Sequence, residues 1–382
     1  MIKLTLVKIN NILYVNLVLI IGEIELKKVK FSKTLKLYII LFFVLVSIII
    51  SILVIYDKIY KQEKPFENTS LAMGTYVQQT VYGKKSELAA KAAIKDISDL
   101  ENLISWRIEN SQIAKINSNA GEDWVSLDGK TLDILLKSVD VSKKSMGYYD
   151  LTILPISNLW DFGGDNQKVP SIKEIENNLP LVGYKNLKIN EDVKRAKLLE
   201  KGSGIDLGAV GKGTACDVAI ESYKNNGADY GLIAVGGSIG VYGTKPNKTP
   251  WNIAIRNPFK GLESTDSIAI IKIRDGFLST SGSYEKCFEE NGTTYHHILN
   301  PKTGYPVETD LVAVTVLHSN GTMSDLLSTA CFVLGKESSI PILEHYGAQA
   351  IFIDKNKNIY ATDKILNNIT VVNEEYKICD WQ

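Results

Sequence analysis

The sequence predicts an α+β domain preceded by one N-terminal membrane-spanning helix. Of the 382 residues, 45% are apolar and 23% are charged, which suffices for a globular core and excludes a disordered or collagen-like chain. Residues 37–56 form an uncharged, largely apolar run. Beyond it, segments with helical spacing come first and short β-branched segments follow. Because helices and strands are grouped rather than alternated, an α+β fold is favoured over a doubly wound sheet.

The apolar run at 37–56 has 20 residues, which span about 30 Å as a helix and so match a bilayer. Five lysines lie between residues 27 and 36 and three between 58 and 64, which favours a cytoplasmic N-terminus. A cleaved signal peptide is the alternative, but no A-x-A-like site follows the run. We therefore expect a cytoplasmic segment (1–36), a single-pass anchor in the cell membrane (37–56), a polar linker (57–69) and an extracytoplasmic domain (70–370).

The charge of the chain is balanced overall, with 43 basic and 43 acidic residues. Residues 1–36 carry seven Lys and two Glu, so the remainder holds 36 basic and 41 acidic residues, a net charge of −5. A mildly acidic body without a basic stripe argues against nucleic acid as a partner. The cysteines form no CxxC pair, so we expect buried thiols rather than a disulfide scaffold or a zinc knuckle. They are Cys216, Cys287, Cys331 and Cys379.

The elements of the body follow from the spacing of apolar residues. Spacings of three and four predict helices over 86–104 and 130–145. Short β-branched runs bounded by Gly, Pro, Asn or Asp predict strands. These runs are 231–237, 251–258, 267–276 and 311–318. The pair Asp275 and Gly276 predicts a hairpin turn, and a last helix is expected over 324–334, ending at Gly335.

A glycine-rich segment, GSGIDLGAVGKGT at 202–214, ends a short predicted strand and opens a helix. Glycines let the backbone approach a ligand closely, and a helix N-terminus offers unpaired N–H groups to an anion. Lys212 adds a positive charge suited to phosphate. Neither the Rossmann nor the Walker spacing is met, so the segment indicates either a phosphate site or a tight turn without a ligand.

The last predicted helix carries polar residues in the segment SDLLSTAC at 324–331. Asp325 and Thr329 are four residues apart and share a helix face, with Ser328 beside them. A carboxylate, two hydroxyls and nearby carbonyls form an all-oxygen set that suits Mg²⁺ better than zinc. Ordinary helix capping by Ser324 or Asp325 is the alternative.

Two adjacent histidines stand in the segment YHHILNPKTGYP at 295–306. Adjacent side chains of a strand point to opposite faces, and no third zinc ligand is spaced nearby. A single histidine that acts as a hydrogen-bond partner or general base is therefore favoured over a zinc pair.

These three motifs, with further short segments in the same order, resemble the FAD:protein FMN transferases, the ApbE family, over residues 73 to about 360. The further segments are MGT (73–75), YDLT (149–152), WDFG (160–163), VGG (235–237) and STSG (279–282). The resemblance implies a T-fold-like α+β architecture that binds FAD and Mg²⁺ in one cleft. It also implies transfer of FMN from FAD to a Thr or Ser hydroxyl of an acceptor redox protein, with release of AMP.

The resemblance also assigns roles by position. It places FAD contacts at Met73, Trp106, Tyr148, Tyr149, Asp150, Asp206, Lys212 and Ile298. It places metal ligands at the carbonyl of Ala209 and the side chains of Asp325, Ser328 and Thr329. His297 lies near the transfer site and would help to deprotonate the acceptor, with Asp325 as the second catalytic residue. The chain departs from the family at Trp106 and Arg107, either of which would contact the flavin ring or adenine, and at Asn300, where Asp is common.

The chemistry is consistent with these roles. Breaking a pyrophosphate requires its charge to be neutralised, which Mg²⁺ and Lys212 would do, and the acceptor hydroxyl needs a base or the metal. Two alternatives remain open: an FAD pyrophosphatase that gives FMN and AMP, and a flavin-binding module without turnover. Asp206, Asp325 and Thr329 favour catalysis, because binding alone does not require a metal at the pyrophosphate.

Overall fold

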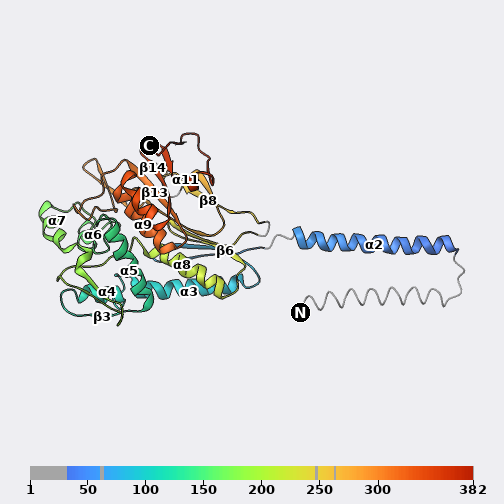
Figure 1. Ribbon diagram of the computed structural model, residues 1–382, viewed down its shortest axis with the longest axis horizontal. Helices are drawn as coiled ribbons and strands as arrows, with labels where there is room; N and C mark the ends of the chain where they lie inside the picture. Colours follow the sequence, from blue (N-terminus) through green and yellow to red (C-terminus); the bar gives the residue numbers. More distant parts are fainter. Residues whose placement is uncertain (1–31, 61–63, 246–247, 262–263, 382) are drawn as a thin grey trace. The chain divides into compact units, whose positions relative to one another are not determined.

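The computed structural model describes residues 32–60, 64–245, 248–261 and 264–381. The chain divides into two units, Met1–Gln62 and Glu63–Gln382. The described part of the first unit is one helix, α2 (Lys33–Tyr60) (Figure 1). The helices of the second unit are α3 (Ser86–Ile104), α4 (Gln112–Ser118), α5 (Gly129–Lys144), α6 (Leu154–Trp160), α7 (Ile172–Asn178), α8 (Gly211–Asn225), α9 (Gly321–Leu334), α10 (Ile340–Tyr346) and α11 (Asp363–Leu366).

Most strands of the second unit are short. They are β1 (Phe66–Ala72), β2 (Thr75–Tyr82), β3 (Val125–Ser126), β4 (Leu187–Asn190), β5 (Arg195–Leu198), β6 (Tyr230–Val235), β7 (Ser238–Tyr242), β8 (Trp251–Arg256), β9 (Ser267–Ile273), β10 (Gly276–Gly282), β11 (Cys287–Glu290), β12 (Thr293–His296), β13 (Leu311–His318), β14 (Gln349–Asp354), β15 (Asn358–Ala361), β16 (Ile369–Val371) and β17 (Lys377–Ile378). The predicted α+β fold is confirmed.

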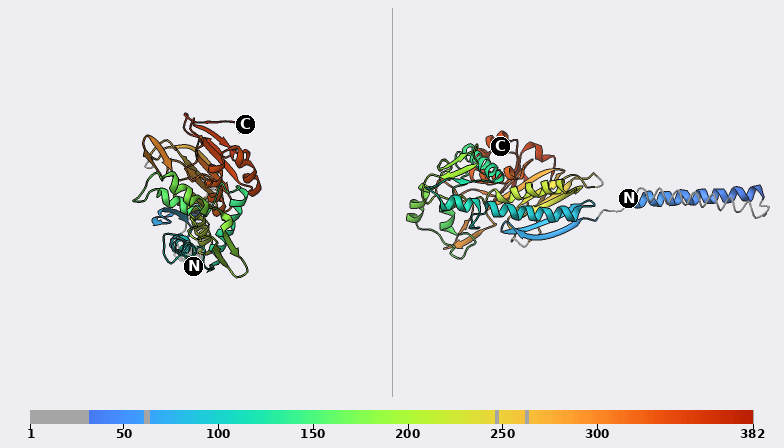
Figure 2. Two further views of the ribbon diagram at one scale, coloured as in Figure 1. Left: turned by 90° about the vertical axis from the view of Figure 1, so that its left-hand side faces the viewer. Right: turned by 90° about the horizontal axis from the view of Figure 1, so that it is seen from below.

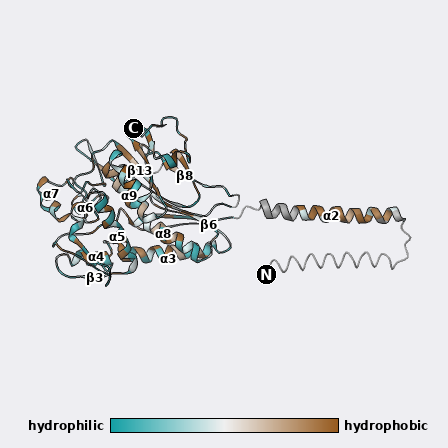
Figure 3. Cartoon of the chain, in the orientation of Figure 1, coloured by the Kyte–Doolittle hydropathy of each residue, from teal (hydrophilic) through white to brown (hydrophobic). Residues whose placement is uncertain are grey.

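The predicted membrane segment, 37–56, falls within α2. The described part of this helix is largely hydrophobic (Figure 3), and most of its apolar side chains up to Ile52 are exposed. Within the described ranges, no helix combines the length and the apolar character needed to cross a membrane. The predicted transmembrane helix is therefore not supported by the described residues. The side chains of residues 53–56, and residues 1–31 of the predicted cytoplasmic segment, lie outside the described residues.

A nine-stranded sheet forms the centre of the second unit, in the order β1-β2-β6-β7-β10-β13-β14-β15-β17. Its neighbouring strands are antiparallel, except for the parallel pair β15 and β17. Helices α3, α8 and α9 pack on one face, and the smaller sheet β16-β9-β8 shares an apolar core with the other (Figure 1 and Figure 2). Because β13 is covered on both faces, its residues 311–316 are all buried.

Local signals placed several elements correctly. The predicted helix over 86–104 is confirmed as α3 with the same bounds. Helix α9 begins at Gly321, three residues earlier than predicted, because the side chain of Asn320 accepts the N–H of Met323 at 3.0 Å and caps the helix.

The predicted hairpin at Asp275 and Gly276 is wrong. Strand β9 pairs with β8 and β16 in the small sheet, whereas β10 pairs with β7 and β13 in the large one. The carboxylate of Asp275 accepts the N–H of Gly243 at 2.7 Å, and Gly276 takes a φ of 124°. Asp275 and Gly276 therefore connect a strand of the small sheet to a strand of the large one. The pairing of these strands with distant partners, rather than the local turn sequence, decides this connection.

Regular secondary structure continues on both sides of the predicted domain, 70–370. Helix α2 continues to Tyr60 and β1 begins at Phe66, so the structure overlaps both ends of the predicted linker 57–69. Strand β17 follows residue 370, and the ring of Trp381 packs edge-on against Phe352 with centroids 5.1 Å apart. All four cysteines are free; Cys216 and Cys331 are buried as predicted, whereas Cys287 is exposed and Cys379 is half-buried.

Candidate active site

The glycine-rich segment forms the loop that leads into α8. Asp206 accepts the N–H of Gly208 at 2.8 Å, a local turn that shapes the loop. The N–H of Asp206 donates to the carbonyl of Leu151 at 2.9 Å, and Ile153 forms a parallel bridge with Gly204. The structure therefore brings the predicted YDLT segment beside the glycine-rich loop.

Helices α8 and α9 meet at Gly213 and Asp325. A Cβ at Gly213 would lie 2.1 Å from the carbonyl oxygen of Gly321, so only glycine fits there. The N–H of Gly213 donates to Oδ2 of Asp325 at 2.7 Å, and Ser238 donates to Oδ1 at 3.3 Å. Asp325 is 3% exposed and lies against the first turn of α8, where the helix dipole favours negative charge.

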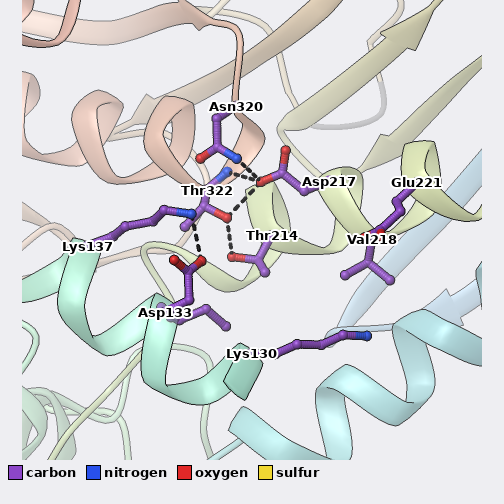
Figure 4. A pocket seen from close by; sticks show the side chains of 10 residues that line it. Lys130, Asp133, Lys137, Thr214, Asp217, Val218, Glu221, Asn320 and Thr322 are labelled. Carbon is purple, nitrogen blue, oxygen red and sulfur yellow. Dashed lines mark hydrogen bonds and ion pairs between the residues drawn. The ribbon is translucent and has the colours of Figure 1, made fainter. Parts of the chain in front are cut away.

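A second carboxylate, Asp217, joins the same two helices one turn further along α8 (Figure 4). It accepts hydrogen bonds from the side chain of Asn320 at 2.9 Å and from the N–H groups of Gly321 and Thr322 at 2.7 Å each. The hydroxyl of Thr322 also donates to it, at 2.7 Å. Burial raises the pKa of Asp217, and the hydrogen bonds lower it in part. Asp217 thus fixes the start of α9 and so positions Asp325; sequence reasoning gave it no role.

The predicted metal ligands of α9 share one face, as their spacing indicated. Ser281 of β10 hydrogen-bonds to the hydroxyl of Ser328 at 2.8 Å and to that of Thr329 at 3.0 Å. Ala209 precedes Gly213 by four residues, in the loop that leads into α8. Among the described residues, no three His, Cys, Asp or Glu side chains cluster as a metal site. The set therefore has one carboxylate completed by neutral oxygens, a donor type that fits Mg²⁺. Ser281 belongs to the STSG segment (279–282), and it was assigned no role from the sequence.

Tyr149 is a buried residue next to Asp150 in the chain, and its side chain is 4% exposed. Burial raises the pKa of this phenol, and the hydroxyl of Ser138 lowers it in part. The negative charges of Asp150, Asp325 and Asp206 raise it further. Three predicted site carboxylates thus lie near one buried ring.

The carboxylate of Asp150 accepts hydrogen bonds from two nearby segments of the protein. It accepts the N–H of Thr152 at 2.9 Å, the hydroxyl of Thr152 at 2.6 Å and the N–H of Tyr184 at 2.7 Å. Burial raises its pKa against the effect of these hydrogen bonds. Asp150 therefore holds two segments together, and its contact with FAD stays a prediction.

Three basic side chains near the glycine-rich loop influence one another electrostatically. Burial lowers the pKa of Lys286, and the charges of Lys212 and Arg107 lower it further, while Asp206 and Glu285 offset part of this effect. The guanidinium of Arg107 stacks on the ring of Trp106 at 3.9 Å from its centroid. Trp106 and Arg107, either of which the sequence allowed as the FAD contact, thus stack on each other. Sequence reasoning missed Lys286, because no glycine or helix start marks it.

His297 follows β12 and donates its N–H to the carbonyl of Lys286 at 2.9 Å. Burial lowers its pKa to about 3, assisted by the charges of Lys212 and Lys286, so the imidazole is neutral near pH 7. Its buried Nδ1 has no hydrogen-bond partner among the described atoms. His296 instead hydrogen-bonds to the carbonyl of Val307 at 3.2 Å. His297 is thus a neutral imidazole with an unpaired ring nitrogen, whose protonation is opposed by burial and by the two lysine charges.

The remaining predicted FAD contacts, Met73, Tyr148 and Ile298, have different surroundings in the structure. Met73 has a φ of 55° in the turn between β1 and β2, and its Cε would lie 2.8 Å from a Cβ at Gly211, the first residue of α8. The Nζ of Lys302 lies 5.8 Å from the ring centroid of Tyr148. Ile298 is 5% exposed and belongs to the core. The contacts of these side chains with FAD stay predictions.

The fold and this site define an α+β protein in which the N-terminus of α8 lies against a buried carboxylate of α9. The chain belongs to the ApbE family, whose model matches residues 73–352.

Relatives agree with this assignment. The chain is 28% identical over 331 residues to a FAD:protein FMN transferase of Treponema pallidum, covering 82% of this chain and 91% of that protein. It is 26% identical to one from Klebsiella pneumoniae, covering 82% and 97%. The crystal structure of an ApbE protein from Thermotoga maritima superposes with a TM-score of 0.74 at 31% identity, covering 80% of this chain and 99% of that one.

Proposed function

We propose that this protein transfers FMN from FAD to a Thr or Ser hydroxyl of an acceptor redox protein, releasing AMP in a Mg²⁺-dependent reaction. Family membership and the names of the relatives support the activity. The observation that carries it is the pairing of Asp325 with the N-terminus of α8. Because of this pairing, a cation held by Asp325 would lie beside an anion held by the N-terminus of α8, as cleavage of a pyrophosphate requires. A T-fold-like classification of the α+β body is part of the same proposal.

Each side of the site has its own task. The N–H groups at the start of α8 and the ammonium of Lys212 would bind the FAD pyrophosphate. Asp325, Ser328, Thr329 and the carbonyl of Ala209 would hold Mg²⁺. When bound, the ion would neutralise charge on the phosphate oxygens.

The transfer step forms one P–O bond and breaks another. The acceptor oxygen attacks the phosphorus of the FMN half, and the bond from this phosphorus to the AMP phosphate breaks. The neutral imidazole of His297 accepts the hydroxyl proton as the oxygen attacks. The products are the FMN phosphoester of the acceptor and AMP.

The test is to incubate the purified chain with FAD, Mg²⁺ and a candidate acceptor, and to follow AMP and the intact mass of the acceptor. A mass gain equal to FMN minus water, stoichiometric with AMP, supports transfer. Equal AMP release with and without acceptor, with the acceptor unmodified, would instead identify an FAD pyrophosphatase. FAD binding without AMP release would identify a binding module.

We also propose that residues 37–56 anchor the protein in the cell membrane, with the second unit outside the cytoplasm. The support is the length of the uncharged run and the excess of lysines before it. An acceptor in the membrane or outside the cytoplasm would then be within reach of the site.

A further inference from the structure

Lys286 faces the same side of a β-hairpin as His297. Strands β11 and β12 pair with Cys287 opposite His296, and the N–H of His297 donates to the carbonyl of Lys286 at 2.9 Å. Lys286 and His297 are therefore the next opposed pair. Directly opposed residues of antiparallel strands project to the same face, with their Cβ atoms about 5 Å apart. The ammonium of Lys286 is thus carried beside the imidazole of His297.

The ammonium of Lys286 has no partner among the residues that the structure describes. It makes neither a hydrogen bond nor an ion pair with any described side chain, and the residue is exposed to solvent. The surrounding protein and the charges of Lys212 and Arg107 nevertheless lower its pKa, so this ammonium is partly shielded from water and lies near two other cations. The mutual repulsion of Lys286, Lys212 and Arg107 raises the free energy of the protein without ligand. An anionic ligand bound among them would reduce this repulsion.

The second of these cations, Lys212, belongs to α8. Lys212 lies in the first turn of α8, where its Cδ would lie 3.2 Å from a Cβ at Gly236. The charges of Lys212 and Lys286 both reach His297, since each lowers the pKa of that imidazole. The three side chains therefore converge from two elements that are far apart in sequence, α8 and the hairpin β11–β12.

We propose that Lys286 is a phosphate-binding residue that holds the FAD pyrophosphate from the hairpin side, opposite Lys212. This inference rests on the proposed function, because it takes FAD as the ligand. Lys286 and His297 flank the same β-hairpin. A phosphate bound by Lys286 would therefore also hold in place the strand that leads to the imidazole of His297. A neutral side chain of similar length removes the charge but leaves the backbone bond to His297 in place.

The test measures binding of FAD and of riboflavin, without acceptor, to the wild-type chain and to Lys286→Met, Lys286→Gln and Lys286→Arg. Riboflavin carries the same ring system without phosphate. Lys272→Met is the matched control, since Lys272 is an exposed lysine on β9, in the small sheet on the other face of the large one. Thermal unfolding confirms that each variant is folded.

We expect Lys286→Met and Lys286→Gln to weaken FAD binding about ten- to a hundredfold, as for loss of a charged hydrogen bond. Riboflavin binding should be unchanged, and Lys286→Arg and Lys272→Met should bind FAD nearly as the wild type does. Wild-type affinity for FAD in both neutral variants overturns the role of Lys286 and leaves the proposed function intact. A wild-type chain that does not bind FAD overturns both.

Discussion

Oδ2 of Asp325 on α9 accepts a 2.7 Å hydrogen bond from the backbone N–H of Gly213 on α8, 112 residues earlier in the chain. Asp217 joins the same two helices again through Gly321 and Thr322. The proposed metal ligands on α9 and the proposed phosphate site on α8 therefore move as one body. Loss of the contact between Asp325 and Gly213 is expected to affect both halves of the site, whereas loss of the Asp217 contacts is expected mainly to loosen the packing of the two helices.

The first prediction concerns the charge of Asp325. Asp325→Asn keeps the shape of the side chain but removes the charge that would attract a divalent cation. We expect FAD cleavage to fall at least about 10²–10³-fold, the usual cost of one essential electrostatic contact. FAD binding should persist, because the N-terminus of α8 and Lys212 remain. AMP release and FAD affinity are the measurements.

Asp217→Asn is the matched control, since Asp217 is also a buried carboxylate between α8 and α9 but is not a proposed metal ligand. It should lower the stability of the protein more than its turnover per folded molecule. If Asp325→Asn cleaves FAD at the wild-type rate, α9 does not carry the metal site.

The second prediction concerns the contact between the two helices. A Cβ at Gly213 would lie 2.1 Å from the oxygen of Gly321 and 2.6 Å from Cβ of Asp325, so Gly213→Ala must push α8 and α9 apart. We expect a loss of stability of about 1–3 kcal/mol, as for overpacking of a core, together with a loss of AMP release. Urea unfolding measures the first effect.

Gly129→Ala provides the control for this substitution. Gly129 is the first residue of α5, and the nearest atom to its added Cβ is Nζ of Lys194 at 4.0 Å. This variant should be as stable as the wild type or more stable, because alanine favours a helix. Equal stability of Gly213→Ala and Gly129→Ala would show that α8 and α9 do not meet as closely as described.

The third prediction concerns protonation of His297. Its pKa in the folded protein is about 3, below the ordinary value of 6.5, so between these values only the unfolded chain binds this proton. The contribution of His297 to stability is therefore full above about pH 6.5 and is lost progressively as the pH falls towards 3. His297→Gln should make stability depend less steeply on pH across this window.

Urea unfolding at a series of pH values between about 4 and 8 measures how the free energy of unfolding changes with pH. This series covers most of the window between the two pKa values. Proton NMR titration of the histidines checks it independently, with the missing signal in His297→Gln giving the assignment. His345→Gln, in which an exposed imidazole is removed, serves as the control. An imidazole of His297 that titrates in the folded protein near pH 6.5 would contradict its burial among cations.

The fourth prediction concerns membrane topology. If residues 37–56 anchor the chain with its second unit outside, protease added to intact cells or spheroplasts should digest that unit. A cytoplasmic marker protein must survive the same treatment. Protection of the second unit until the cells are lysed would place it in the cytoplasm, and recovery of the full chain in the soluble fraction would exclude the anchor.

Some features followed from the sequence by itself because their causes act within a few residues. Apolar spacing fixed α3 at 86–104, since a helix face depends only on residues three and four apart. The same periodicity placed Asp325, Ser328 and Thr329 on one face of α9. The order of short motifs along the chain identified the family, which the match over residues 73–352 confirms.

Other features were decided only by the tertiary structure, because they join residues that are distant in the chain. Local turn chemistry at Asp275 and Gly276 predicted a hairpin, yet β9 and β10 found their partners in two different sheets. Lys286 carries no local signal, and it joins the site because hairpin register sets it opposite His297. The contact of Gly213 with Asp325 likewise exists only because α8 and α9 pack on the same sheet face. Register and packing depend on every strand between such residues, so no short window of sequence contains them.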